Sequence, residues 1–163
     1  MRKNGEIKVV IIGSNDVGKT TLMENLIGKI GKVEHNGITT AIDYGSLTID
    51  GRKIHFFGTP GQKRFEFMRE LVLKGTNLAL VVLDASKGIT EEDKEIIKLL
   101  ESKEIPYGVF INKTDIGEID INEVYNLCNP KFIIKGCAIK KDGLNEIINE
   151  IMSHISTYSV KKI

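Results

Sequence analysis

The chain has 163 residues, 41% of them hydrophobic, which is typical of one domain with a full apolar core. Its 23 Lys and Arg against 22 Asp and Glu leave a net charge of +1, so it lacks the basic surface expected of a nucleic-acid-binding protein. Cys128 and Cys137 are too few for a disulfide framework and lack metal-ligand spacing. We therefore expect a single cytoplasmic domain, residues 1–163, with no nucleic-acid partner.

Neither end of the chain carries a signal for membrane attachment. Residues 1–6 are polar, and no apolar run approaches the length of a membrane span. Arg2 stands where myristoylation requires Gly, and residues 159–163 contain no cysteine for prenylation. We expect no intrinsic membrane anchor.

The first third of the chain predicts strands, a helix and a loop in turn. An apolar run predicts a strand at 7–12, and a helical period follows at 18–28. The polar segment 29–40 has no clear period and predicts a mobile loop. Strands at 44–49 and 53–57 flank Asp50-Gly51, a strong two-residue hairpin signal, so one strand is antiparallel to the rest.

The remainder of the chain alternates between strands and helices. We predict strands at 78–83, 107–111 and 132–135, and helices at 64–74, 91–102, 121–127 and 144–158. This alternation predicts an α/β fold, a doubly wound, mostly parallel six-stranded sheet with one antiparallel edge strand and five helices. Ligands of such folds bind at the carboxyl ends of the strands.

The segment Gly13-Ser14-Asn15-Asp16-Val17-Gly18-Lys19-Thr20 lies directly between the first predicted strand and helix, and it is a complete phosphate-binding loop. Its glycines permit a tight turn whose N–H groups face phosphates, Lys19 reaches the β and γ oxygens, and the Thr20 hydroxyl ligates Mg²⁺. The positive end of the following helix faces the same anion. The expected nucleotide contacts in this loop are Asn15, Asp16, Val17, Gly18, Lys19, Thr20 and Thr21.

A second motif, Asn112-Lys113-Thr114-Asp115, follows the predicted strand 107–111. The Asp115 carboxylate can accept both the N1–H and the N2 amino group of guanine, whereas adenine offers no matching pair of donors. The stem of Lys113 can cover the base plane, and the Asn112 amide can tie this loop to the phosphate loop. The motif therefore predicts guanine as the base.

The turn formed by Cys137, Ala138 and Ile139 follows another predicted strand and precedes the last helix. A backbone N–H near Ala138 could donate to the guanine O6, because the small side chain allows close approach. An ordinary strand-to-helix turn is the alternative interpretation.

Together these motifs resemble the Ras-like small GTPase superfamily. The resemblance includes Gly58-Thr59-Pro60-Gly61-Gln62, and segments 39–45 and 57–65 are similar to a prokaryotic branch that includes the polarity GTPase of gliding bacteria. It implies a G-domain with strand order 2-3-1-4-5-6, bound GTP or GDP with Mg²⁺, and two loops that order around the γ-phosphate. It also implies GTPase-activating and effector proteins, including a regulator of the roadblock type.

The resemblance also implies roles for single residues. Thr39, with Thr40 as the alternative, would ligate Mg²⁺ together with Thr20, and Gly61 would sense the γ-phosphate through its N–H. Gln62 would orient the attacking water, so that Gln62 and Lys19 are the expected catalytic residues.

Two departures from the family pattern concern the metal and the rate. Gly58 stands where most members have an Asp that holds Mg²⁺ through water, and Asp43 is a conceivable substitute, although we favour a loop-end or strand-start role for it. Asn15 can crowd an external arginine finger, and segment 30–42 contains no arginine. Arg64 and Arg69 follow Gln62 and could serve as an arginine finger, but we favour exposed charges on a helix for both. We therefore predict slow hydrolysis that a partner accelerates.

Two other functions compete with a GTP-hydrolysing switch. Gly58 would also suit a scaffold subunit that binds guanine nucleotide with negligible hydrolysis, although Gln62 argues against this alternative. A phosphate-loop kinase of small metabolites would need an arginine-bearing lid, and the motif at 112–115 would then be a coincidence.

Overall fold

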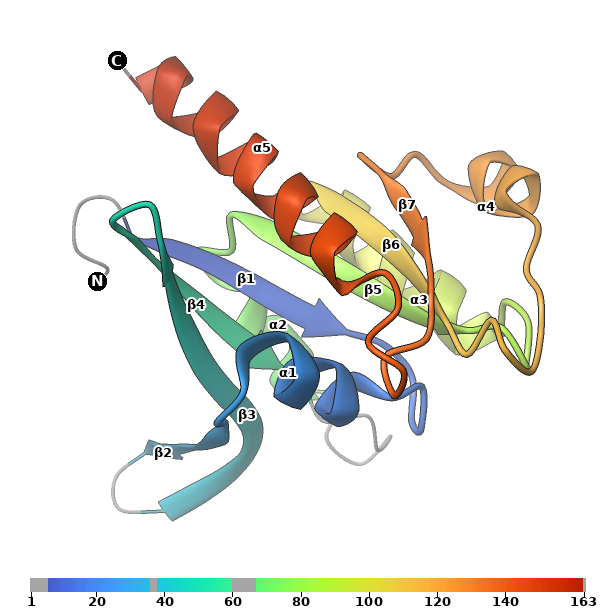
Figure 1. The fold of residues 1–163 in the computed structure, drawn as a ribbon, viewed down its shortest axis with the longest axis horizontal. Coiled ribbons are helices and arrows are strands. Elements are labelled where there is room, and N and C mark those ends of the chain that lie inside the picture. The colour runs from blue at the N-terminus through green and yellow to red at the C-terminus, as the bar shows by residue number, and fades with distance from the viewer. Residues whose placement is uncertain (1–5, 36–37, 60–66, 163) are drawn as a thin grey trace.

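The computed structural model describes residues 6–35, 38–59 and 67–162. Within these ranges it contains seven strands and five helices, drawn in Figure 1. In chain order they are β1 (Ile7–Ile12), α1 (Lys19–Ile27), β2 (Gly31–His35), β3 (Ile38–Ile49), β4 (Arg52–Gly58), α2 (Phe67–Leu73), β5 (Leu78–Asp84), α3 (Glu91–Ser102), β6 (Tyr107–Asn112), α4 (Ile121–Leu127), β7 (Ile133–Lys135) and α5 (Leu144–Lys162).

All seven strands form one sheet in the order β2-β3-β4-β1-β5-β6-β7. The pairs from β4 through β1, β5 and β6 to β7 are parallel, whereas β3 pairs antiparallel with both β4 and β2. The predicted doubly wound α/β fold is confirmed. Without β2, the order of the remaining six strands is the predicted 2-3-1-4-5-6.

The sequence prediction missed the edge strand β2. Segment 29–40, expected as a loop, contains β2, and β3 begins at Ile38, six residues before the predicted start of that strand. The lengthened β3 offers its free backbone groups to the preceding residues, and this pairing orders β2 despite its polar sequence. Figure 1 shows the resulting β2–β3 hairpin projecting away from the helices beyond α1.

Helices cover both faces of the sheet because the central strands are apolar on both sides. One core joins α1 and α5 to the sheet, and a second core joins α2, α3 and α4 to the opposite face. All seven residues of β5 and all six of β6 are buried. The polar groups that follow these strands therefore lie on a rigid support.

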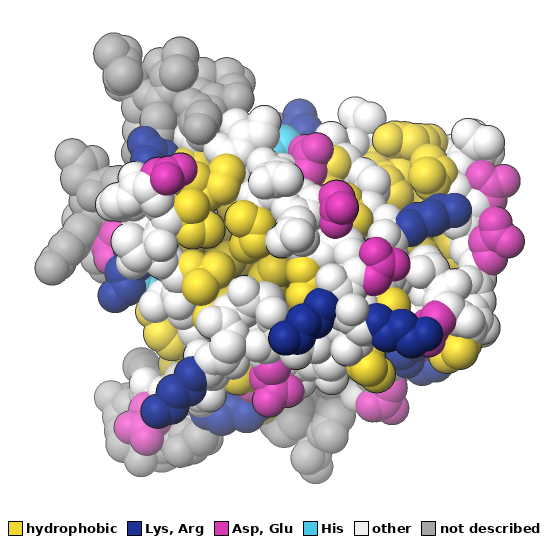
Figure 2. Space-filling model, in the orientation of Figure 1, with side chains coloured by type: hydrophobic (Ala, Val, Ile, Leu, Met, Phe, Trp, Pro, Cys, Tyr) yellow, Lys and Arg dark blue, Asp and Glu magenta, His cyan; other side chains and the backbone are white. Residues whose placement is uncertain are grey.

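On the face drawn in Figure 2, acidic and basic side chains are interspersed, so no large patch there carries charge of a single sign. In the part of the chain that the structure describes, none of the helices combines the length and the apolar character needed to cross a bilayer.

Candidate functional site

The phosphate loop lies between β1 and α1, at the sheet end toward which the β1 arrow points in Figure 1. A Cβ atom on Gly13 would lie 2.7 Å from the carbonyl oxygen of Val82, so the loop can pass β5 this closely only with glycine. Gly18 has a φ of 98°, and a Cβ atom there would lie 2.5 Å from Nδ2 of Asn112. Both glycines of the motif are thus required by backbone conformation or by close approach.

Lys19 is buried inside this loop, with only 7% of its surface exposed. Its Nζ donates to the carbonyl oxygens of Gly13 at 2.9 Å and Ser14 at 2.7 Å. Burial, and after it the nearby positive charge of Arg69, lowers the pKa of Lys19 to about 8. The Lys19 ammonium group is therefore largely shielded from bulk water, and a bound anion would stabilise its charged form.

Asn112, at the end of β6, connects the two motifs as the sequence predicts. Its Nδ2 donates to the Val17 carbonyl at 2.9 Å, and its Oδ1 accepts from the Ala138 N–H at 2.9 Å. Asn112 is 3% exposed, so these bonds are shielded from water. One side chain thus fixes the phosphate loop, the 112–115 loop and the turn before α5 relative to one another.

Lys113 is held in an extended position across the site by two acceptors. Its Nζ donates to Oδ2 of Asp84 at 2.8 Å and to the carbonyl oxygen of Asp16 at 2.9 Å. Burial opposes ionisation of Asp84, but hydrogen bonds from Lys113 and Ser86 outweigh it and lower the pKa of this carboxyl. Both Asp16 (φ 61°) and Lys113 (φ 64°) adopt left-handed conformations, a strain that often marks functional loops.

Sequence reasoning missed Asp84, which orients Lys113. The signal was available, because Asp84 is an acidic residue that directly ends a buried strand at the edge where ligands of this fold bind.

Asp115 lies beside this network with its carboxylate accessible. Desolvation opposes its ionisation, but hydrogen bonds from the Cys137 thiol and its own backbone, with the nearby Lys140 ammonium, outweigh this and lower the pKa of Asp115. Lys140 Nζ lies 3.5 Å from Oδ2 of Asp115. An ionised carboxylate is therefore available at neutral pH to accept from two adjacent donors.

The turn before α5 is arranged differently from the sequence expectation. The N–H of Ala138, expected to donate to guanine O6, is hydrogen bonded to Asn112 in this structure. The neighbouring Ile139 is 76% exposed on the same turn. The contacts of Cys137, Ala138 and Ile139 with a base stay predictions, and a contact from the Ala138 amide would require exchange of its present partner.

A carboxylate lies next to the Thr20 hydroxyl that was predicted to ligate metal. Thr20 Oγ1 donates to Oδ2 of Asp43 at 3.1 Å. Lys32 Nζ donates to the other oxygen, Oδ1 of Asp43. Asp43 is in the middle of β3, opposite Gly58 of β4, and not at a strand start as the sequence favoured. Within the described residues, no three His, Cys, Asp or Glu side chains form a protein-only metal cluster.

The predicted switch residues are only partly described. The backbone of Thr39 pairs with Glu34 across the β2–β3 hairpin, four strand residues from Asp43, a separation of about 13 Å along the strand. The Thr40 hydroxyl donates to the carbonyl of Val33 at 2.8 Å. Ligation of one ion by Thr20 and either threonine would require this hairpin to rearrange, so these roles stay predictions. Gly61 and Gln62 lie outside the described residues.

Arg69 differs from the sequence expectation of an exposed charge. It is 2% exposed, and its Nη2 donates to Oε1 of Glu92 on α3 at 2.8 Å. The adjacent Asp93 accepts from the Ser14 hydroxyl of the phosphate loop at 3.2 Å. The start of α3 thus connects Arg69 of α2 to the phosphate loop. Arg64 lies outside the described residues.

Comparison with known sequences places this geometry in a family context. Residues 5–157 match the family model described as the elongation factor Tu GTP-binding domain. The chain is 82% identical over 152 residues to an uncharacterized protein of Methanocaldococcus jannaschii, covering 93% of this chain and 99% of that protein. It is 32% identical over 156 residues to translation initiation factor IF-2 of Ureaplasma parvum, but it spans only 25% of that factor's length.

Solved structures give the same fold. The G domain of the T. maritima FeoB iron transporter superposes with a TM-score of 0.73 at 24% identity, covering 91% of this chain and 98% of that one. Elongation factor SelB from Methanococcus maripaludis, solved with the GTP analogue GppNHp, gives a TM-score of 0.72 at 26% identity, covering 92% of this chain and 34% of that one. These similarities are to translation factors and FeoB, and they do not support the Ras-like and gliding-polarity placement made from the sequence.

Proposed function

This chain belongs to the elongation factor Tu GTP-binding domain family, and from this premise we propose that it binds GTP and GDP with Mg²⁺ and slowly hydrolyses GTP to GDP and phosphate. The observation that carries the proposal is the buried Asn112, whose amide joins the phosphate loop to the 112–115 loop. This side chain fixes the spacing between Lys19, at the phosphate end of the site, and Asp115, at the base end. The site can therefore select a nucleotide that spans this distance and carries a matching base.

Each residue of the site has a task in binding. The amides of residues 14–20 and the Lys19 ammonium take the phosphates, and Lys19 has three donors, of which the carbonyls of Gly13 and Ser14 use two. Asp115 accepts from the guanine edge, and Lys113, held by Asp84, lies along the base. In hydrolysis, Lys19 stabilises charge on the transferred phosphoryl group, and Gln62 orients the attacking water.

The oxygen donors near the phosphate loop fit Mg²⁺, which is usually held by one or two protein oxygens together with phosphates and waters. Thr20 presents a hydroxyl at the start of α1, with its proton directed to a carboxylate. Thr39, or Thr40 as the alternative, is the second protein ligand that the family resemblance implies. When bound, Mg²⁺ would neutralise phosphate charge beside Lys19.

We place this activity in a single cytoplasmic G domain that acts as a switch. The M. jannaschii protein, spanned over 99% of its length, supports a G domain of this size as the working unit. The position of β3 supports a switch, because this one strand carries the predicted switch threonines and the carboxylate beside Thr20. A partner protein would accelerate hydrolysis. The roadblock-type partner was implied only by the Ras-like placement, which the comparisons do not support.

Calorimetry with GDP and ADP tests this function directly. With Mg²⁺ present, we expect GDP to bind at least about 10²-fold more tightly than ADP, because adenine leaves the Asp115 carboxylate facing an acceptor. A Lys19→Ala variant should bind GDP much more weakly while keeping its fold by circular dichroism. The proposal is wrong if the folded chain binds neither nucleotide, or binds ADP as tightly as GDP.

The lowered pKa of Lys19 predicts proton uptake on binding. In the free protein this pKa is about 8, and an anionic ligand raises it, so Lys19 is mostly neutral well above pH 8 until GDP arrives. At pH 8.5 GDP binding should take up most of one proton, and at pH 7 only a small fraction of one. The apparent affinity should accordingly fall as pH rises through 8. Calorimetry in two buffers of different ionisation enthalpy measures this uptake, and equal heats in both buffers at pH 8.5 would contradict it.

A further inference from the structure

At position 58 the chain lacks the carboxylate that the family pattern places near the metal. Gly58 occupies that position at the end of β4 and is buried. A Cβ atom on Gly58 would lie 2.6 Å from Sδ of Met23, a fully buried side chain of α1. The packing of α1 on β4 therefore leaves no room for any side chain at this position unless Met23 moves.

A different residue places a carboxylate in the adjoining space. Asp43 is the direct partner of Gly58 across the β3–β4 ladder, and its Oδ2 lies 3.6 Å from where a Cβ atom of residue 58 would be. The Asp43 side chain is 10% exposed, and it accepts from Thr20 Oγ1 at 3.1 Å. The carboxylate thus reaches the phosphate-loop hydroxyl from the neighbouring strand.

We propose that Asp43 is the anionic anchor for the nucleotide-bound Mg²⁺, replacing from β3 the carboxylate that β4 lacks. The proposal rests on the nucleotide binding proposed above. Asp43 is thereby a positioning residue for the metal site, and Gly58 is the small residue that makes space for it.

The hydrogen bond between Thr20 and Asp43 explains how this anchor works. A hydroxyl group has one proton and two lone pairs. Because Asp43 Oδ2 accepts the proton, the lone pairs of Thr20 Oγ1 remain available to a cation. Outer ligands that orient an inner ligand in this way usually change metal affinity by about 10–100-fold when removed. The negative charge of Asp43 adds long-range attraction in a largely buried setting.

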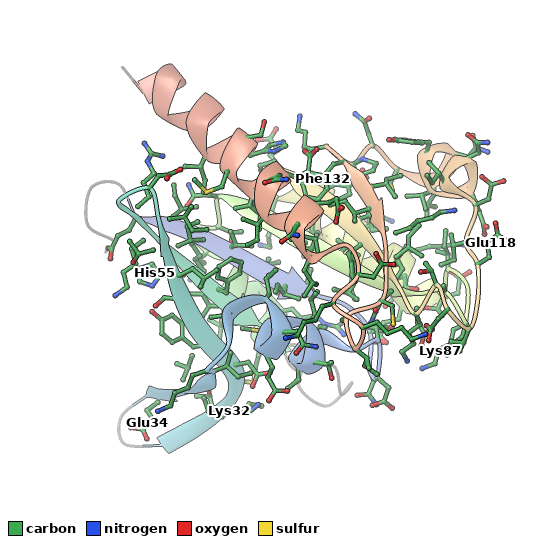
Figure 3. All side chains as sticks on the ribbon, in the orientation of Figure 1. Lys32, Glu34, His55, Lys87, Glu118 and Phe132 are labelled. Atoms are coloured by element: carbon green, nitrogen blue, oxygen red, sulfur yellow. The ribbon has the colours of Figure 1, made fainter. Side chains whose placement is uncertain are left out.

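Lys32 is the counter-ion that competes with the metal for this carboxylate. It extends from β2, on the hairpin where Figure 3 labels it beside Glu34, and donates to Oδ1 of Asp43. Its side chain is 47% exposed, so it can leave the carboxylate at small cost. Removal of Lys32 should therefore strengthen Mg²⁺ binding at this site, whereas removal of Asp43 should weaken it. These opposite signs separate the proposal from a purely structural role.

Release of a fluorescent GDP analogue at graded Mg²⁺ concentrations tests the proposal without measuring hydrolysis. For Asp43→Asn, the Mg²⁺ concentration that half-maximally slows release should rise about 10–100-fold, whereas for Lys32→Met it should fall severalfold. Asp50→Asn, an exposed carboxylate in the turn after β3, is the matched control and should leave the value unchanged. Release in EDTA should be similar for all four proteins, which shows that the nucleotide pocket is intact.

The outcomes distinguish the two proposals. If the wild-type chain fails to bind the analogue with or without Mg²⁺, the proposed function fails. If the wild type binds and shows a Mg²⁺ effect that Asp43→Asn leaves unchanged, the assignment of Asp43 is wrong. A Lys32→Met variant that loses the Mg²⁺ effect instead of strengthening it also overturns the assignment, even if Asp43→Asn does not fold.

Discussion

Replacing Asp115 with Asn is expected to turn a guanine-selective site into a xanthine-selective site. The substitution removes the carboxylate that we propose accepts from the N1–H and the N2 amino group of guanine, and it presents an amide N–H₂ to the donor at N2. Hydrogen bonds to charged groups contribute about 1.5–3 kcal/mol each, so the loss of two should lower GDP affinity about 10²–10⁴-fold. Xanthine has a carbonyl at C2, which accepts from the new amide, so XDP affinity should rise.

The comparison requires a control that changes charge but not base contact. Asp120→Asn serves, because Asp120 is an exposed N-cap of α4 that accepts from the Asn122 N–H at 2.9 Å, and Asn is an equally good cap. Competition of GDP, XDP and ADP against a fluorescent nucleotide measures the three affinities. If Asp115→Asn binds GDP as the wild type does, Asp115 is not the base selector.

The selection should also persist under mildly acidic conditions. The lowered pKa of Asp115 keeps its carboxylate charged as pH falls from 7, since a depressed pKa delays protonation to lower pH. Loss of GDP binding in this range would therefore have to come from another group.

Local patterns were sufficient to predict the fold class and the positions of six strands, and the family resemblance supplied the order of these strands. The alternation of apolar runs with helical periods and the Asp50-Gly51 turn act within short segments, and the structure retains them. The edge strand β2 was missed because its stability comes from the partner strand β3 and not from a period-2 pattern of its own. Segment 29–40 carries few apolar residues that would have indicated a strand.

Tertiary pairing decided the parts of the site that sequence reasoning misjudged. Arg69 is buried because α3 presents Glu92 to it, 23 residues further along the chain. Asp43 reaches Thr20 only once β3 is in register with β4, so that the absence of a side chain at Gly58 opens the space. Neither the Arg69–Glu92 contact nor the Asp43–Thr20 contact has a local sequence signal. The contact of Asn112 with the phosphate loop was predictable because its amide follows a buried strand in a known motif.

The arrangement of Asp43 links the proposed metal site to the edge of the sheet. One of its oxygens holds the hydroxyl at the start of α1, and the other holds Lys32 of β2. A change in what occupies the site near Thr20 therefore acts on the same strand that carries Thr39 and Thr40. In the proposed switch, a change at the nucleotide could therefore reach the β2–β3 hairpin through the direct contacts of Asp43.

Hydrolysis of GTP by the isolated chain is expected to be slow, with a rate constant of about 10⁻⁴–10⁻² s⁻¹. Lys19 supplies positive charge at the phosphates, but segment 30–42 contains no arginine, and Arg69 is buried and paired with Glu92. An arginine finger is worth about 10³–10⁵ in rate, so hydrolysis without one at the phosphates should be slow. Single-turnover measurement with γ-labelled GTP gives the rate, and a value above about 1 s⁻¹ would contradict this view.

Gln62→Leu separates a slow enzyme from a nucleotide-binding scaffold. If Gln62 orients the attacking water, its loss should lower the single-turnover rate about 10²-fold, because misplacement of a reacting group by about 1 Å has an effect of that size. GTP affinity should remain unchanged, since the phosphate loop and Asp115 are untouched, and this affinity is the internal control. An already negligible wild-type rate that Gln62→Leu does not alter would favour the scaffold. In that case the free energy of GTP binding, and not its cleavage, would drive the switch.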